Sequence, residues 1–133
     1  FSRMEAITFV LTLRIKPSAD MKEVMDTAAL MMASTEKKPG ALFYQYYMEN
    51  DTEIKYLETF SNSDTARSHL LNQDANLHQQ WFSLIELTSC CVVGPANEDL
   101  KKILQTVPVS CTFVDRLGGF GPRESHKTEK QTE

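Results

Sequence analysis

YLETFSNSDTARSH, residues 56–69, joins the end of one predicted element to the start of the next. The period-two alternation over its first part predicts a β-strand that carries Glu58 on the same face as its aromatic residues. Ser61 or Ser63 then supplies the N-cap of a short helix that carries His69. This stretch therefore predicts a carboxylate on a strand and an imidazole on the helix that folds back over the sheet.

A strand and a long helix are predicted upstream of this segment. Residues 7–15 (ITFVLTLRI) place an apolar side chain at every second position, which is typical of a strand with one buried face. Asp20 followed by Glu23 has the spacing of a capping box, and Pro39-Gly40 ends the helix that this box begins. The apolar stripe expected on this helix consists of Met21, Val24, Met25, Ala28, Met31 and Met32.

The downstream elements complete an alternating order of strands and helices. Residues 41–49 and 54–60 are expected to be strands, and the turn residues 50–52 between them predict a β-hairpin. A second helical piece begins at Asp74 and precedes a strand at 88–93. The resulting order, βαββαβ, is the ferredoxin-like arrangement, an α+β fold with an antiparallel sheet.

An additional helix and strand follow this core. Asn97 is expected to cap a helix over 98–105, and residues 109–117 are expected to form a fifth strand. The polar residues 123–133 show no periodicity and predict a disordered tail. With 133 residues in all, the chain has the length of one domain, which we place at 1–122.

Composition argues against several classes of partner. A net charge of −4 gives no basic surface for nucleic acid, and no apolar run is long enough to span a membrane. Cys90, Cys91 and Cys111 lack metal-site spacing; as an odd number in strand-like runs, they predict small buried side chains in a reducing, cytoplasmic compartment. No zinc, phosphate-loop, dinucleotide or nucleophile-elbow motif is present, so no metal site is expected.

The second face of the sheet is predicted to need a cover. Helices on one face leave the other in water, and an extended apolar surface there is unfavourable. A second copy of the chain is the simplest cover, so we expect a homodimer in which two sheets face each other. The apolar residues assigned to this face are Val10, Leu42, Tyr44, Tyr46, Met48 and Leu57.

The segment around Glu58 resembles the antibiotic biosynthesis monooxygenase (ABM) family. Glu58 is followed by Phe60 and by a helix with an acidic first turn, and His69 comes eleven residues after the glutamate. The resemblance covers residues 6–94 and implies a dimeric α+β barrel. It also implies a cofactor-independent monooxygenase in which His69 is the general base and Glu58 orients or assists it.

The same resemblance implies a pocket between the sheet and its helices. Its substrate is expected to be a small, flat phenolic, quinol or anthrone-type compound. His78 lies farther from His69 than the second histidine of the family does, which leaves its correspondence open. The residues expected to bind the substrate are Phe9, Phe43, Tyr47, Tyr56, Phe60, His78 and Trp81, and Leu11 and Met25 are expected to complete the lining.

Structural roles are open for the same residues. His69 fits a partly exposed helix residue that is hydrogen-bonded to Glu58 or to the backbone. Glu58 fits an ion pair with a lysine or arginine, and Trp81 fits a core anchor. The alternative function is a non-catalytic dimeric module that binds a small molecule or responds to stress, with a shallow pocket and structural histidines. A dry pocket of roughly several hundred Å³ that holds His69 beside Glu58 favours the enzyme.

Overall fold

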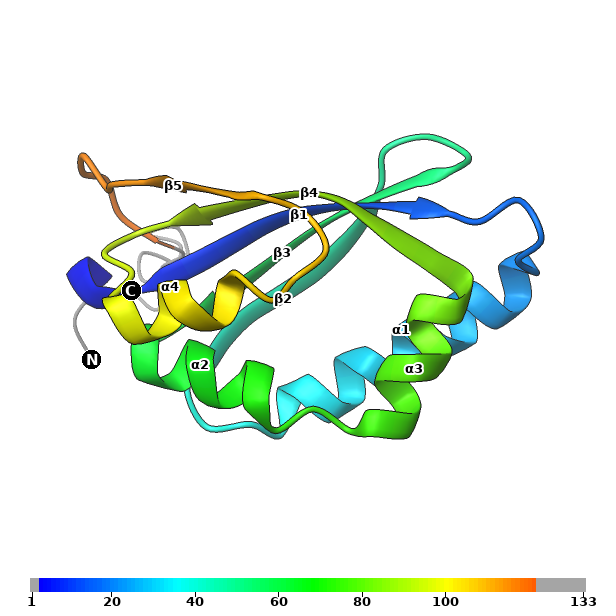
Figure 1. The fold of residues 1–133 in the computed structure, drawn as a ribbon, viewed down its shortest axis with the longest axis horizontal. Coiled ribbons are helices and arrows are strands. Elements are labelled where there is room, and N and C mark those ends of the chain that lie inside the picture. The colour runs from blue at the N-terminus through cyan, green and yellow to red at the C-terminus, as the bar shows by residue number, and fades with distance from the viewer. Residues whose placement is uncertain (1–2, 122–133) are drawn as a thin grey trace, which may run out of the picture.

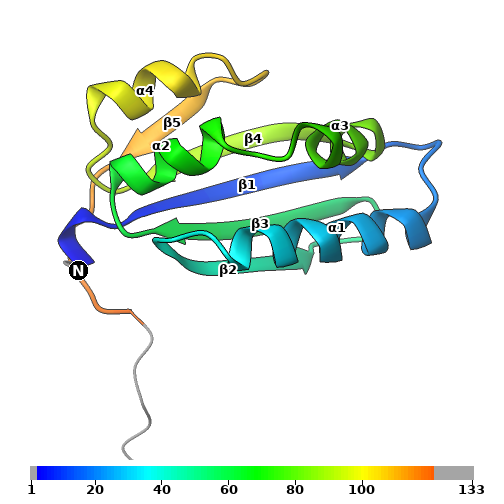
Figure 2. The same ribbon diagram turned by 90° about the horizontal axis from the view of Figure 1, so that it is seen from below.

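A five-stranded sheet with its α-helices on one face forms the framework of the protein (Figures 1 and 2). The computed structural model describes residues 3–121. The elements in chain order are η1 (Arg3–Glu5), β1 (Ile7–Ile15), α1 (Met21–Glu36), β2 (Ala41–Met48), β3 (Glu53–Phe60), α2 (Ser63–Leu71), α3 (Ala75–Leu84), β4 (Ile85–Val93), α4 (Glu98–Leu104) and β5 (Cys111–Val114).

The strand order β2-β3-β1-β4-β5 confirms the predicted ferredoxin-like core. Strand β1 pairs antiparallel with β3 and β4, and β2 pairs antiparallel with β3. The fifth strand is parallel to β4 and extends the sheet of its own chain, so the complete sheet is mixed. Strand β4 begins three residues earlier than the predicted 88–93, and β5 is shorter than the predicted 109–117.

The core confirms the alternation in β1 but corrects the face of α1. Every second β1 residue from Ile7 to Ile15 is buried. On α1 the buried side chains include Val24, Thr27 and Ala28, whereas Met25 is 66% exposed. Apolar residues surround this helix on most sides, so periodicity alone did not select the face that packs on the sheet. The methionines wrongly expected to fill the core are Met21, Met25 and Met32.

Side-chain caps begin the helices, and one of them differs from the prediction. Asp20 accepts a hydrogen bond from the Glu23 backbone N–H at 3.1 Å, as expected. The cap of α2 is Asn62, not Ser61 or Ser63: its side chain accepts from the Thr65 N–H, and the Thr65 hydroxyl accepts from the Asn62 N–H. Ser63 is instead the first helical residue.

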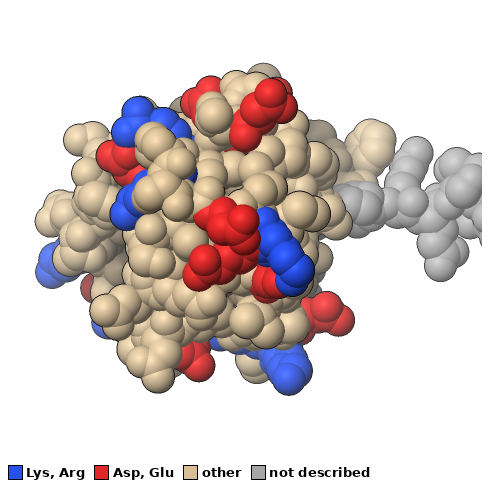
Figure 3. All heavy atoms as spheres, turned by 90° about the vertical axis from the view of Figure 1, so that its right-hand side faces the viewer, with Lys and Arg blue, Asp and Glu red and all other residues tan. Residues whose placement is uncertain are grey.

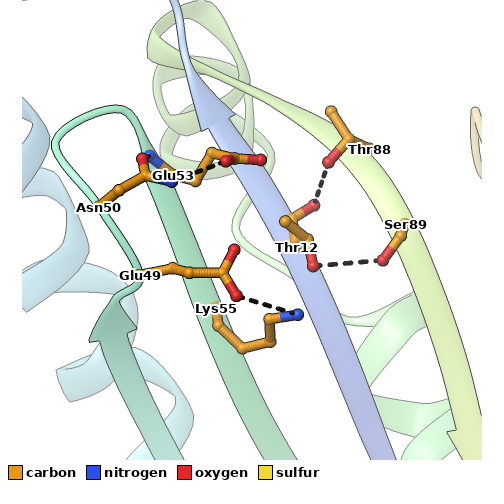
Figure 4. A network of polar contacts seen from close by, with 7 residues as sticks. All are labelled: Thr12, Glu49, Asn50, Glu53, Lys55, Thr88 and Ser89. Atoms are coloured by element: carbon orange, nitrogen blue, oxygen red, sulfur yellow. Dashed lines mark hydrogen bonds and ion pairs between the residues drawn. The ribbon is translucent and has the colours of Figure 1, made fainter.

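The outer face of the sheet, opposite the helices, is more polar than predicted. Figure 4 shows part of it: Lys55 forms an ion pair with Glu49, and Ser89 donates to the Thr12 hydroxyl. Tyr46 pairs with the buried Tyr56 and therefore lies on the inner face, like its neighbour Tyr44. The assignment of these tyrosines and of Met48 to the outer face was wrong, because the turn between β2 and β3 sets a different register. The apolar residues of the outer face include Val10, Phe43, Tyr47 and Leu57.

The rest of the surface carries charges of both signs. Figure 3 shows a side of the molecule on which acidic and basic groups are scattered among uncharged residues, without an extended basic area on that side. In residues 3–121, no helix combines the length and the apolar character needed to cross a membrane. The predicted tail, 123–133, lies outside the described residues.

Candidate functional site

A cavity of about 650 Å³ lies between the inner face of the sheet and the helices. Most of its lining is apolar and comes from β1, β4, α3 and the chain between α4 and β5. Four neighbouring polar side chains interrupt this lining, and we call them the polar strip: Tyr44, Glu58, His69 and Gln73.

Strand pairing places the first half of the polar strip. On the inner face, Glu58 in β3 stands between Phe9 of β1 and Tyr44 of β2. The adjacent row consists of Leu11, Tyr56 and Tyr46. Because paired positions share a face, the register alone brings a carboxyl and a phenol side by side within an aromatic wall.

Helix α2 adds the imidazole to this wall. His69 is 6% exposed, and its Nε2 lies 3.6 Å from Glu58 Oε2. The ring of Phe60 packs against the imidazole, with the centroids 4.8 Å apart. Gln73, one turn further along the chain, has its amide nitrogen 3.4 Å from the same Nε2. The histidine is therefore buried against the carboxyl and is not the partly exposed helix residue of the structural alternative.

Lys38 reaches the other side of the imidazole. Its Nζ lies 3.3 Å from His69 Nδ1 and 3.3 Å from the carbonyl oxygen of Asn72. An ammonium group has donors only, so Nδ1 acts as the acceptor. By this contact the ring proton of a neutral His69 is on Nε2, which faces Glu58. The Gln73 amide nitrogen is also a donor and requires the same Nε2 to accept, so the two contacts do not fix a single tautomer.

Burial moves the pKa values of the two groups in opposite directions. Loss of solvation raises the pKa of Glu58 from 4.5 to about 8, although the positive charge of Lys38 opposes this effect. Loss of solvation, together with the charge of Lys38, lowers the pKa of His69 to about 4. Near neutral pH the pair is therefore an uncharged imidazole beside a largely protonated carboxyl.

Three tyrosines form a connected cluster next to this pair. The hydroxyl groups of Tyr44 and Tyr46 are 2.7 Å apart, and Tyr46 stacks on Tyr56 with a centroid distance of 4.7 Å. Burial raises the pKa of Tyr44 to about 12 and raises that of Tyr56 well above its usual range. The cluster therefore stays protonated at physiological pH, and Tyr44 presents a phenol O–H at the cavity wall.

Trp81 of α3 contributes an unusual donor. Its side chain lines the cavity and is 1% exposed, and its indole N–H has no hydrogen-bond partner among the described residues. The indole meets Tyr46 edge to face at 5.9 Å. An unpaired buried N–H is unfavourable, so the indole of Trp81 contributes less to stability than a fully paired one would.

The structure places most of the predicted site residues at one cavity. Phe9, Tyr56, His78 and Trp81 line it together with Glu58 and His69. His78 lies at an exposed position and packs against Phe82, with centroids 4.6 Å apart. Trp81 is both a core anchor and a lining residue.

Four of the expected lining residues lie elsewhere. Phe60 supports the His69 ring from behind the lining. Phe43 and Tyr47 project from the outer face because Phe43 pairs with Thr59 and Tyr47 pairs with Lys55. Their assignment to the pocket was wrong because the two faces of β2 were exchanged in the prediction, which is also why Tyr44 and Tyr46 were wrongly assigned to the outer face. Met25 is exposed on α1 and was also wrongly assigned.

Other functional residues were missed in the sequence. Tyr44 follows from the correct hairpin register, which a two-residue alternation does not specify. Lys38 lies in the loop before β2, and nothing in the sequence indicates its contact with a histidine 31 positions away. Leu104 and Val107 close the cavity from the C-terminal extension, which lies beyond the segment that resembles the ABM family.

Comparison with known proteins supports the fold. No protein-family profile and no curated protein matches the sequence. Solved structures of other proteins resemble this one, among them the following three. MupZ from Pseudomonas fluorescens has a TM-score of 0.71 at 22% identity, over 89% of this chain and 95% of that one. SnoaB, a cofactor-independent oxygenase from Streptomyces nogalater, has a TM-score of 0.60 at 14% identity, over 70% and 95%.

The third structure is a candidate antibiotic biosynthesis monooxygenase from Chloroflexus aurantiacus, with a TM-score of 0.54 at 14% identity, over 70% of this chain and 95% of that one. These likenesses confirm the predicted ABM-like fold. At such identities they concern the fold alone. The match to MupZ covers more of this chain than the other two.

Proposed function

We propose that this protein binds a small, flat phenolic, quinol or anthrone-type compound in the cavity and oxygenates it with O₂, without a bound cofactor. The observation that carries the proposal is the buried Glu58 carboxyl at the cavity wall, with a pKa raised to about 8 and an imidazole 3.6 Å away. Structural carboxyl groups are rarely buried without a close cationic partner, whereas a base for a weakly acidic phenol needs a pKa near that of the working pH.

Glu58 is the better candidate for the base, and His69 the better candidate for a donor. A histidine with a pKa near 4 is too weak a base for a phenolic proton. In this proposal Lys38 donates to Nδ1, and the His69 proton is on Nε2, toward Glu58. The roles expected from the family resemblance are therefore exchanged in our proposal: the carboxylate accepts the substrate proton, and the imidazole N–H stabilises the negative charge that develops.

A further donor lies in the same space. The Tyr44 hydroxyl lies in the polar strip, beside Glu58, and can donate to a bound oxygen. Donors aimed at a developing oxyanion in a water-poor cavity lower its free energy more than they do in water. In this proposal they hold the deprotonated oxygen of the substrate.

The proposed reaction balances without an external reductant. Deprotonation by Glu58 makes the compound electron-rich, and it reduces O₂ by successive electron transfers to form a carbon-bound hydroperoxide. In an anthrone-type compound the oxygenated carbon is a ring CH₂: the proton taken up by Glu58 completes the hydroperoxide, and loss of water then leaves a carbonyl. One oxygen atom is then in the product and the other is in water. The protein supplies the base, the donors and the exclusion of solvent.

Oxygen consumption by the purified protein tests this proposal. We would screen hydroquinones, naphthoquinols and anthrones without added cofactor and compare Glu58→Gln, His69→Gln and Tyr47→Phe. Glu58→Gln should lose activity by about 10²-fold or more, whereas the outer-face control Tyr47→Phe should match the wild type. Turnover that is unchanged in Glu58→Gln would refute the role of the carboxyl.

The pH dependence of kcat/KM separates the two candidate bases. With Glu58 as the base, kcat/KM rises with pH and levels off above about 8. With His69 as the base, it levels off just above a pKa of about 4. The inflection should stay in place for substrates of different phenolic pKa, because it belongs to the free enzyme.

The non-catalytic binding module remains the alternative proposal, and fluorescence distinguishes it. Trp81 is the single tryptophan of the chain and lines the cavity, so a bound aromatic compound should quench its emission. Quenching by compounds that cause no oxygen uptake would favour the binding module.

We also propose that the outer face pairs with a second copy of the chain. Val10, Phe43 and Leu57 form an apolar region on this face, which no helix of the described chain covers. Sedimentation should therefore give a dimer, and Leu57→Glu should convert it to a monomer. A wild-type monomer at tens of micromolar would overturn this assembly.

A further inference from the structure

Two cysteines face each other across the last pair of strands. Cys90 of β4 and Cys111 of β5 are register partners, and their sulfur atoms are 3.0 Å apart. Both are free thiols. Cys91, the next residue, alternates to the outer face and has Thr112 as its register partner.

The backbone spacing suits a disulfide between these two residues. Neighbouring strands lie about 4.8 Å apart, within the usual 4.4–6.8 Å Cα separation of a disulfide. The two sulfur atoms, 3.0 Å apart, must move about 1 Å closer to reach the length of a disulfide bond, and rotation of the side chains supplies this movement. The bond therefore requires no rearrangement of the strands. Adjacent Cys90 and Cys91 lack this geometry because their side chains point to opposite faces.

The pair also spans a wall of the cavity. Cys90 is 5% exposed and lines the cavity, whereas the partly exposed Cys111 lines a separate groove of about 530 Å³ between α4 and β5. Leu104 at the end of α4, and Val107 and Pro108 in the chain that joins α4 to β5, line the cavity. Strand β5, with four register pairs to β4, holds this wall on the sheet.

We propose that Cys90 and Cys111 are a reversible disulfide site that responds to peroxide and fastens the α4–β5 wall to the sheet. Attack of the Cys111 thiolate on hydrogen peroxide breaks the O–O bond and gives a sulfenic acid and water. The Cys90 sulfur then attacks the Cys111 sulfur, and the Cys90 proton leaves with the sulfenic hydroxyl as a second water. Overall, two thiols lose two protons and two electrons, and one peroxide becomes two waters. A small thiol reverses the bond by exchange.

The order of attack follows from exposure. Cys111 is reached from the groove between α4 and β5, which also carries Lys101 and Glu98, whereas Cys90 is 5% exposed and burial raises the pKa of its thiol. The exposed sulfur therefore reacts first, and the buried sulfur resolves it. Such a transient bond is compatible with a reducing compartment.

Intact-mass analysis after treatment of the folded protein with one equivalent of hydrogen peroxide tests the site. Wild type and the matched control Cys91→Ser should lose about 2 Da, and peptide mapping should join Cys90 to Cys111. Cys90→Ser and Cys111→Ser should not lose this mass, and tris(2-carboxyethyl)phosphine should restore the original mass of the wild type. Circular dichroism checks that each variant is folded.

Hydrogen exchange tests the structural consequence. In oxidised wild type, exchange of the backbone amides over residues 104–114 should slow severalfold relative to the reduced protein, and Cys91→Ser should behave in the same way. Stable oxygen adducts without the loss of about 2 Da, a Cys90–Cys91 linkage, or a dimer linked between chains would overturn the proposal. These readouts need no substrate, so they are independent of the proposed activity.

Discussion

Glu58→Gln should make the protein more stable, by an amount that grows with pH. Folding raises the pKa of this carboxyl from 4.5 to about 8. Between these two values the folded state binds more protons than the unfolded state, so the free energy of unfolding falls as pH rises. The full gap corresponds to about 5 kcal/mol, at about 1.4 kcal/mol per pKa unit. Glu58 is 4% exposed, so solvent screening does little to reduce this figure.

The experimentally useful part of this window lies between pH 6.5 and 9. Over that range the wild type should lose about 2 kcal/mol through Glu58, because the folded carboxyl ionises while the unfolded one is already charged. A glutamine at this position does not titrate. The difference in unfolding free energy between Glu58→Gln and the wild type should therefore increase by about 2 kcal/mol across the range.

Urea unfolding at 25 °C, followed by Trp81 fluorescence at several pH values, measures this difference. The protein concentration must stay constant because association contributes to apparent stability. Glu98→Gln, a substitution of an exposed α4 glutamate, controls for the change of residue type. A difference that varies by less than about 0.5 kcal/mol between pH 6.5 and 9 would mean that Glu58 titrates below this range. It would then not be the high-pKa base of our proposal.

Three further outcomes are expected. Lys38→Met should raise the pKa of His69, because it removes a positive charge that disfavours the imidazolium form. The chemical shifts of the histidine ring protons, followed as a function of pH, measure this pKa. An unchanged pKa would place Lys38 away from the ring in solution. Trp81→Phe should lower the free energy of unfolding by about 1 kcal/mol, measured by urea unfolding followed by circular dichroism. This is less than is usual for shortening a buried aromatic residue, because the substitution also removes an unpaired indole N–H. A loss above about 4 kcal/mol would show that the indole N–H has a partner in solution. Oxidation of the Cys90–Cys111 pair should raise the free energy of unfolding by about 3 kcal/mol, measured without reductant. The reason is that a bond between residues 21 positions apart closes a loop and so restricts the unfolded chain. No gain in stability would indicate a strained bond.

Local patterns in the sequence predicted the elements well. The alternation over Ile7–Ile15 predicted β1 with its observed bounds, and Asp20, Asp74 and Asn97 cap the helices expected of them. The order βαββαβ followed from these elements, as did the placement of Glu58 on a strand and His69 on the next helix. Such signals depend on residues only a few positions apart in the sequence, so they can be recognised without the tertiary structure.

The chemistry of the candidate site depended on contacts between distant segments. The register of the β2–β3 hairpin turned Tyr44 toward the cavity and Tyr47 away from it, although both belong to the same aromatic run. A shift of one residue exchanges the faces of a strand, and alternation alone does not specify which face is inward. The packing of α1 similarly left Met25 exposed while its neighbour Val24 became buried.

The sequence by itself determined the order of elements and which residue types were available for catalysis. The tertiary structure alone decided that Lys38 contacts His69, that Glu58 has a pKa near 8, and that Cys90 faces Cys111. The physical reason is that capping and periodicity are properties of adjacent residues, whereas proton affinity and sulfur contact depend on desolvation and on charges brought together by the fold. The exchange of roles between Glu58 and His69 in our proposal follows from that difference.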